Sequence, residues 1–279
     1  MGAAMVGRLA DAGHDVVVYN RTTARARQLA ERHGAGVAAT PKEAAATADV
    51  VVVSLADDAA VRAAYLGPEG LVAGLRPGAV VADTSTVDPA TLQGLRAGVA
   101  AAGATLLDTP VSGSVATVEA GQLLVMVGGP AEALAQAEPV LAAFARRVIH
   151  LGPLGTGATM KLVVNSMVHA LNIALAEALV LAEKAGVERS AAYEVIASSA
   201  VAAPFVLYKR EAYEHPEDTP VAFALDLVAK DLDLAAELAG RVEAQMSQLA
   251  TNQAVVGRAI DAGFGEADMS ALATHLRAG

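Results

Sequence analysis

The first half of the chain alternates short apolar, β-branched runs with segments whose apolar residues recur at helical spacing. The strand-like runs are HDVVVYN (14–20), ADVVVVSL (48–55), GAVVADTST (78–86), ATLLDTPVSG (104–113), QLLVMVGG (122–129) and RRVIHLG (146–152). The helical patterns between them lie near 22–34, 41–47, 57–66, 88–102 and 131–144. Continuous apolar strands separated by helices are typical of a parallel sheet that is covered on both faces. The pattern predicts a Rossmann-like, doubly wound α/β domain.

The pattern changes at Pro153, after which only helical periodicity remains. A proline-containing interruption spans 204–220, and a last helical stretch spans 248–261. We therefore expect two domains, an α/β domain over residues 1–152 and an all-helical domain over residues 153–279.

Charge and composition exclude several classes of function. The formal net charge is -10 and the pI is about 5.0, which argues against nucleic acid or an anionic membrane as the main partner. The absence of cysteine excludes disulfides, thiolate metal sites and a cysteine nucleophile, and we expect no metal site. The sequence begins without a signal-peptide pattern, and its apolar stretches are interrupted before they reach membrane-spanning length. These features predict a cytoplasmic protein.

The segment GPLGTGATMKLVVNSMVHALNIALAEALVLAEKAG (152–186) predicts a helix that is buried on most of its circumference. Lys161, Asn165, His169 and Asn172 would lie along one stripe of this helix. A buried ammonium finds a partner or loses its proton, so Lys161 is a candidate proton shuttle. The alternative is a lysine that extends to the surface along apolar neighbours. Only five of the twenty basic residues are lysines, which favours a functional role for this one.

The opening segment MGAAMVGRLADAGHDVVVYNRT matches the later part of a dinucleotide-binding unit. Gly2 would be the third glycine of a GxGxxG turn, at the point where helix and strand pack closely. The first strand and the first two glycines would precede Met1. Without them, we expect unpaired backbone groups on the neighbouring strands and weakened cofactor binding.

The next strand ends in Asn20, Arg21 and Thr22, where enzymes that prefer NAD place an acidic residue. An arginine there can pair with a 2′-phosphate, and the neutral neighbours do not repel it. This favours NADP(H) as cofactor, with NAD(H) as the second candidate. The alternative is that Arg21 is a surface residue at the start of the next helix.

Four further motifs make the chain resemble the β-hydroxyacid dehydrogenases, a family that includes 3-hydroxyisobutyrate dehydrogenase, tartronate semialdehyde reductase and glyoxylate or succinic semialdehyde reductase. The motifs are ADTSTVDP (82–89), DTPVSGSVATVEAGQLLVMVGG (108–129), GPLGTGATMKLVVN (152–165) and FALDLVAKDLDLA (223–235). Together with the NRT segment they cover nearly the whole chain in the expected order.

The resemblance assigns chemistry to individual residues. It implies that Lys161 is the general acid in carbonyl reduction and the base in alcohol oxidation, and that Asn165 holds the substrate oxygen. It further implies that the substrate carboxylate is received by Ser112, Gly113 and Ser114. Ser114 replaces the second glycine of many members, which is more typical of the glyoxylate and succinic semialdehyde reductases.

The remaining matches concern the cofactor and the second domain. The resemblance implies cofactor contacts from the backbone of Leu55 and Ala56 and from a loop with Ser85 and Thr86. In the second domain, Phe223 matches a position that contacts the substrate. Lys230 and Asp231 match positions that contact the cofactor. The family does not require His169, which we interpret as structural or as supporting the site.

The resemblance implies an NADP(H)-dependent oxidoreductase that interconverts a small β-hydroxyacid and its semialdehyde or keto form. We expect a small carboxylate-bearing aldehyde or hydroxy acid as substrate, a homodimer or homotetramer, and no nucleic-acid or membrane partner. One alternative is an imine reductase, although those enzymes usually lack a lysine at the position of Lys161. A second alternative is a non-catalytic dinucleotide-binding scaffold, against which the pairing of Lys161 with Asn165 argues.

Overall fold

A six-stranded sheet forms the centre of the amino-terminal unit in the computed structural model, which describes residues 1–278. The chain divides into two units, Met1–Lys161 and Leu162–Gly279. The strand order is β3-β4-β5-β7-β6, and β8 also pairs with β7. The strands are β3 (Val50–Val53), β4 (Val80–Asp83), β5 (Thr105–Asp108), β6 (Val111–Ser112), β7 (Leu123–Gly128) and β8 (Ala145–Gly152).

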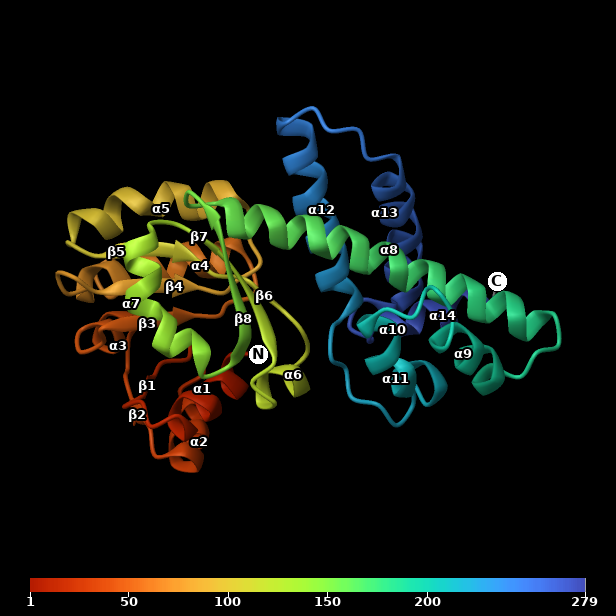
Figure 1. Ribbon diagram of the computed structural model, residues 1–279, viewed down its shortest axis with the longest axis horizontal. Coiled ribbons are helices and arrows are strands. Elements are labelled where there is room, and N and C mark those ends of the chain that lie inside the picture. Colours follow the sequence, from red (N-terminus) through yellow and green to blue (C-terminus); the bar gives the residue numbers. More distant parts are fainter. Residues whose placement is uncertain (279) are drawn as a thin grey trace. The chain divides into compact units, whose positions relative to one another are not determined.

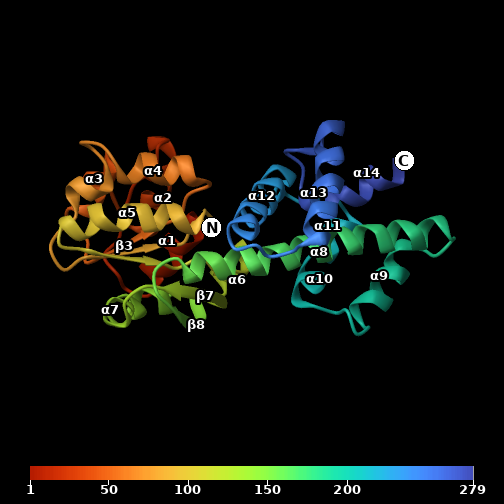
Figure 2. The same cartoon turned by 90° about the horizontal axis from the view of Figure 1, so that it is seen from above.

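Helices cover both faces of this sheet (Figure 2). Their bounds are α1 (Gly2–Asp11), α2 (Thr23–His33), α3 (Pro41–Ala45), α4 (Asp58–Tyr65), η1 (Leu71–Gly74), α5 (Pro89–Ala101), α6 (Val115–Glu119) and α7 (Ala131–Ala142). Alternate residues of β4 serve opposite faces: Val80 and Ala82 pack with residues of α1 and α7, whereas Val81 packs with α4 and α5. Period-two alternation of apolar residues thus builds two cores around one sheet.

The sheet confirms the expected Rossmann-like class, but it is mixed rather than wholly parallel. The pairs β3-β4, β4-β5 and β7-β8 are parallel, while β7 runs antiparallel to β5 and β6. The run 104–113 forms two strands instead of one, separated at Thr109 and Pro110. Proline lacks the N–H that a continuous ladder requires, so the strand breaks there.

Two short strands, β1 (Val17–Val18) and β2 (Gly36–Val37), form a separate parallel sheet. The run 14–20 therefore gives a strand of only two residues. Within residues 1–278, neither β1 nor β2 pairs with the six-stranded sheet, and β3 pairs on one side only. Val17 and Val37 are accordingly exposed.

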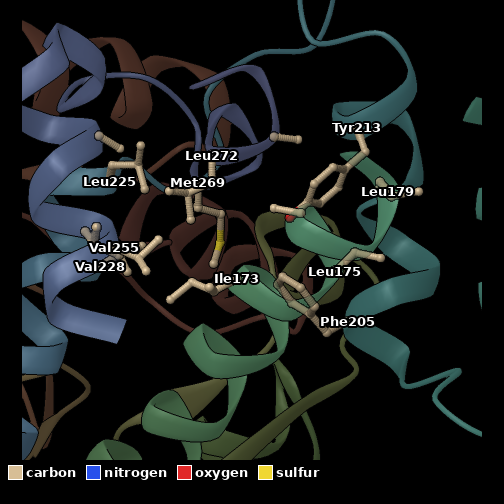
Figure 3. Close-up of a cluster of buried hydrophobic side chains, with 14 of the residues drawn as sticks. Ile173, Leu175, Leu179, Phe205, Tyr213, Leu225, Val228, Val255, Met269 and Leu272 are labelled. Atoms are coloured by element: carbon tan, nitrogen blue, oxygen red, sulfur yellow. The ribbon is translucent and has the colours of Figure 1, made fainter. Parts of the chain in front are cut away.

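The carboxy-terminal unit is built from helices, as the change of pattern at Pro153 predicts. They are α8 (Thr156–Lys184), α9 (Arg189–Ala197), α10 (Pro204–Tyr208), α11 (Arg210–Glu214), α12 (Leu225–Arg241), α13 (Ser247–Ala259), η2 (Ile260–Phe264), η3 (Met269–Ala271) and α14 (Leu272–Ala278). Their apolar faces meet in one core, in which α8 contributes Ile173, Leu175 and Leu179 (Figure 3). The interruption at 204–220 contains the two short helices α10 and α11.

Helix α8 is one uninterrupted helix of 29 residues (Figure 1). It begins in the first unit and continues into the second. Among the described helices, it alone has the length and hydropathy that could cross a membrane. Its buried residues Leu162, Ile173, Leu175 and Leu179 belong to the core of the carboxy-terminal unit, which accounts for its apolar character.

Candidate active site

The amino end of α8 is anchored on the sheet by Asp108, the last residue of β5. Its Oδ1 accepts from the backbone N–H of Gly155 at 2.8 Å, and its Oδ2 accepts from that of Ala158 at 2.6 Å. Both N–H groups lie at the helix start, where no intrahelical acceptor exists. The contact is close because position 157 is glycine: a Cβ there would lie 2.5 Å from the carbonyl oxygen of Met126. Burial raises the pKa of Asp108, although the backbone hydrogen bonds oppose this effect.

Lys161 lies three residues after Ala158, at the end of the first unit. It is half-buried, whereas the apolar surroundings in the sequence suggested full burial. The buried lysine of this protein is instead Lys209, which is 5% exposed.

Asp83 is a second buried carboxyl group. It is the last residue of β4 and lies opposite Asp108 of the neighbouring strand β5. The hydroxyl of Tyr65 donates to its Oδ2 at 2.8 Å, and the backbone N–H of Ser85 donates to its Oδ1 at 2.8 Å. Burial raises the pKa of Asp83 above its usual range, against the effect of these hydrogen bonds. Asp83 thus fixes the loop that follows β4.

The loops after β3 and β4 are tied together, and they carry predicted cofactor residues. The Ser85 hydroxyl accepts from the backbone N–H of Leu55 at 3.0 Å. Ala56 is exposed and Thr86 half-buried beside this link, and Gly2, the first residue of α1, lies against Ser54. Loops at the carboxyl ends of parallel strands are where α/β folds bind nucleotides, so these residues fit a dinucleotide.

The predicted phosphate-reading residues lie between β1 and α2. Asn20 Oδ1 accepts from the backbone N–H of Thr22 at 2.8 Å, which fixes the turn. Arg21 is exposed, and no hydrogen bond or ion pair joins it to another residue within 1–278. Its guanidinium is therefore available for a ligand.

The segment from Ser112 to Ser114 divides into two roles. Ser114 caps α6: its hydroxyl accepts from the N–H of Thr117 at 3.3 Å, and its own N–H donates to the Thr117 hydroxyl at 3.1 Å. Both polar groups of Ser114 are thus used locally. Ser112 is half-buried, and its hydroxyl has no hydrogen-bond partner in the described part of the chain. Gly113 has a φ of 142°, and a Cβ there would lie 2.6 Å from Leu123, so this position requires glycine.

In the carboxy-terminal unit, Asn165 belongs to a buried polar cluster with His169 of α8 and Asp231 of α12. Asn165 Nδ2 donates to Asp231 Oδ2 at 2.5 Å, and His169 Nε2 lies 3.4 Å from the same oxygen. Lys230 Nζ lies 2.9 Å from Asp231 Oδ1. Burial alone would raise the pKa of Asp231, but the hydrogen bond from His169 and the nearby charge of Lys230 outweigh it and lower the pKa.

Phe223, in the same unit, makes a ring contact through its side chain and a hydrogen bond through its backbone. Its ring lies 5.8 Å from that of His169, and its backbone N–H donates to Asp268 Oδ2 at 3.1 Å. Asp268 is buried and accepts from Lys209 Nζ at 2.7 Å. Burial opposes ionisation of Asp268, but the hydrogen bond and charge of Lys209 lower its pKa overall.

The structure thus groups the predicted residues into two sets, one in each unit. The first set is Gly2, Asn20, Arg21, Thr22, Leu55, Ala56, Ser85, Thr86, Ser112, Gly113, Ser114 and Lys161; the second is Asn165, Phe223, Lys230 and Asp231. Sequence reasoning missed the supporting roles of Asp108 and Asp268. A polar residue at the end of a buried strand was the signal for Asp108; no local pattern indicated Asp268.

Comparison with known proteins identifies the family. The NAD binding domain of 6-phosphogluconate dehydrogenase matches residues 1–152, and the NAD-binding domain of NADP-dependent 3-hydroxyisobutyrate dehydrogenase matches residues 155–276. The chain is 32% identical over 277 residues to 3-sulfolactaldehyde reductase of Escherichia coli (strain K12), covering 99% of this chain and 93% of the relative.

Two further similarities extend over nearly all of the chain. Glyoxylate/succinic semialdehyde reductase 2, chloroplastic, of Arabidopsis thaliana is 32% identical over 283 residues, covering 100% of this chain and 77% of the relative. The structure of Psf3 in complex with NADP+ and 2-OPP superimposes with a TM-score of 0.91 at 26% identity, covering 99% of this chain and 96% of that one. The chain therefore belongs to the β-hydroxyacid dehydrogenase family of NAD(P)-dependent oxidoreductases, which act on CH–OH groups.

Proposed function

We propose that this enzyme uses NADP(H) to interconvert a small aldehyde or keto acid that carries an anionic group and the corresponding hydroxy acid. Lys161 acts as general acid in reduction and as general base in oxidation, and Asn165 holds the reacting oxygen. The observation that carries the proposal is their placement on α8: four residues apart on one helix, with the helix start fixed by Asp108. Residues four apart lie on the same face of a helix, about 6 Å along its axis.

Reduction adds a hydride to the carbonyl carbon and a proton to the carbonyl oxygen. NADPH, when bound, supplies the hydride. The Lys161 ammonium supplies the proton as negative charge develops on the oxygen, and a positioned general acid typically contributes about 10²- to 10⁴-fold in rate. In the reverse direction the neutral amine accepts the hydroxyl proton.

The anionic group of the substrate is received by the Ser112 hydroxyl and the backbone at Gly113. Ser112 has a hydroxyl without a partner in the described chain, and glycine exposes its N–H to an anion. The names of two relatives, a sulfolactaldehyde reductase and a glyoxylate/succinic semialdehyde reductase, both denote aldehydes with an anionic group. This supports the substrate class.

The preference for NADP(H) rests on Arg21. A guanidinium without a partner among residues 1–278, flanked by neutral Asn20 and Thr22, suits a 2′-phosphate. The NADP+ bound to Psf3 is consistent with this choice in the family.

We further propose that the enzyme acts in the cytoplasm as a homodimer or homotetramer. Along α8, Val163, Met167 and Leu181 are exposed at 43%, 70% and 72%, an apolar face that self-association would cover. Light scattering of the purified protein, with Met167→Glu as a variant, would test the assembly. A monomer in the unmodified protein would contradict it.

The substrate and cofactor assignments are tested with one panel. Glyoxylate, succinic semialdehyde, methylmalonate semialdehyde and a cyclic imine are each offered with NADPH and with NADH, and nicotinamide oxidation is followed by absorbance. We expect turnover of at least one anionic aldehyde, with NADPH preferred. Turnover of the cyclic imine alone would instead indicate an imine reductase, and no turnover or cofactor binding at all would contradict the proposal.

A further inference from the structure

Asp231 determines which end of the Asn165 amide faces the substrate. An ionised carboxylate can only accept hydrogen bonds, so Asn165 must turn its NH2 group toward Asp231 Oδ2, as the 2.5 Å contact shows. The amide oxygen then lies on the other side of the group. There it can accept a hydrogen bond from a donor such as the hydroxyl of a hydroxy acid.

His169 is placed to hold this arrangement. It follows Asn165 by one turn of α8, and its Nε2 lies 3.4 Å from the oxygen that Asn165 contacts. This is a long hydrogen bond, and the charge of the carboxylate adds electrostatic attraction to it. His169 is 2% exposed and Asp231 is also 2% exposed, so water does not weaken the interaction between them.

The same imidazole supports Phe223. The two ring centroids are 5.8 Å apart with the planes tilted by 33°, a range in which aromatic rings attract each other. Both residues that the carboxy-terminal unit offers to the substrate, Asn165 and Phe223, are therefore linked to His169. Its second ring nitrogen, Nδ1, is buried without a hydrogen-bond partner in the described chain. A buried polar ring with an unsatisfied atom is costly, and an apolar side chain would be the more stable choice if packing alone mattered.

We propose that His169 is a positioning residue, which acts through Asp231 on the orientation of Asn165. This inference rests on the proposed function and extends it to a residue that does not touch the substrate. If it holds, removing His169 lowers activity only as long as Asn165 is present to be oriented.

A double-mutant cycle tests this dependence. His169→Leu should lower kcat/KM for the accepted aldehyde by about tenfold or more, a typical coupling between contacting residues. In the Asn165→Ala background the same change should cost less than about twofold. His169→Gln, which retains an N–H donor, should restore much of the loss and also serves if the leucine variant does not fold.

Asn172→Ala provides the matched control. Asn172 lies on the same helix and is fully buried, but its partners are the backbone of Met269 and the hydroxyl of Tyr213. Its effect on kcat/KM should be the same with and without Asn165. Equal effects of His169→Leu in both backgrounds would overturn the proposal.

A measurement without substrate separates this inference from the proposed function. The chain contains four asparagines, so isotopically labelled asparagine gives few side-chain NH2 signals, and Asn165→Ala identifies the relevant pair. His169→Leu should shift the Asn165 pair and accelerate its hydrogen exchange by about tenfold, leaving Asn252 unchanged. An unchanged Asn165 signal would overturn the positioning role. A changed signal in a protein that reduces no aldehyde would contradict the proposed function alone.

Discussion

The Oδ2 atom of Asp108 accepts a hydrogen bond from the backbone N–H of Ala158 at 2.6 Å, three residues before Lys161. The general acid proposed here is thus held by a helix whose first turn is fixed to a buried strand. Its position depends on the carboxylate of Asp108, both oxygens of which accept hydrogen bonds from backbone N–H groups at the helix start.

Asp108→Ala should therefore reduce both stability and turnover. Loss of a helix cap costs about 0.5–2 kcal/mol in the free energy of unfolding, and the freed N–H groups of Gly155 and Ala158 are buried. Thermal unfolding and steady-state kinetics measure the two effects. Thr40→Ala, which removes the cap of α3, is the control and should lower stability without lowering kcat. A normal kcat in Asp108→Ala would show that Lys161 does not depend on this anchor.

Ser112→Ala and Ser114→Ala should separate binding from folding. The first removes a hydroxyl that is free to bind an anion, and should raise KM for the aldehyde by about tenfold or more, as expected for a hydrogen bond to a charged group. The second removes the cap of α6, and should lower stability by about 1 kcal/mol with KM changed less than about twofold. The reverse outcome would assign the anion to Ser114.

Arg21→Ala should weaken NADPH binding by about ten- to a hundredfold, because one charge-assisted contact to the 2′-phosphate is lost. NADH binding should hardly change. Fluorescence titration with both cofactors measures the difference. Arg25→Ala, which removes an exposed arginine of α2 with the same change in net charge, is the control. Equal weakening of both cofactors by Arg21→Ala would mean that this residue supports the loop and reads no phosphate.

The two units should respond differently to acid. Asp231 and Asp268 have pKa values below their usual range despite burial, because His169, Lys230 and Lys209 favour their charged forms. Their stabilising contribution is complete above the unfolded pKa, near 3.8, and is lost as the pH falls through the lowered folded values.

In the first unit, burial raises the pKa of Asp83 and of Asp108. The part of the folding stability that is linked to their protonation is therefore complete below the unfolded pKa, about 3.8, and is lost as the pH rises through the folded pKa values. On acidification below about pH 3.8, hydrogen exchange resolved by peptide should show that the carboxy-terminal unit loses protection before the first unit. Earlier loss in the first unit would contradict these assignments.

The ion pair between Lys209 and Asp268 gives a related test. Removing one partner of a buried pair costs about 3–5 kcal/mol, because the other charge stays buried alone. Lys209→Met should therefore lower the unfolding midpoint of the carboxy-terminal unit at neutral pH, and should make that midpoint less dependent on acidification, because the pKa of Asp268 is no longer lowered. Lys184→Met, at an exposed position, should change neither.

The apolar runs and the helical spacing of the sequence predicted most of the helices and strands. The apolar runs at 48–55 and 78–86 became β3 and β4, and the change at Pro153 marked the start of the helices. The two-residue strand β2 and the five-residue helix α6 were missed, although the equally short β1 and α3 were predicted within the runs 14–20 and 41–47. The antiparallel direction of β7 depends on long-range pairing with β5 and β6, which no single segment encodes.

The candidate site shows the same division. The stripe of Lys161, Asn165, His169 and Asn172 could be predicted, since helical spacing alone places them on one face. The partners that give them a role could not, because Asp231 lies 62 residues beyond His169, and Asp268 lies 59 residues beyond Lys209. The half-burial of Lys161 is likewise a tertiary property, which helical spacing alone does not determine.

The turnover of Lys161→Ala decides whether this lysine is the proton donor. With an aldehyde accepted by the unmodified enzyme, we expect kcat to fall by about two to four orders of magnitude, the usual contribution of a general acid, while the affinity for NADPH changes little. Lys184→Ala, at the exposed carboxyl end of the same helix, should retain full activity. If Lys161→Ala kept more than about a tenth of the turnover, Lys161 would not be the proton donor.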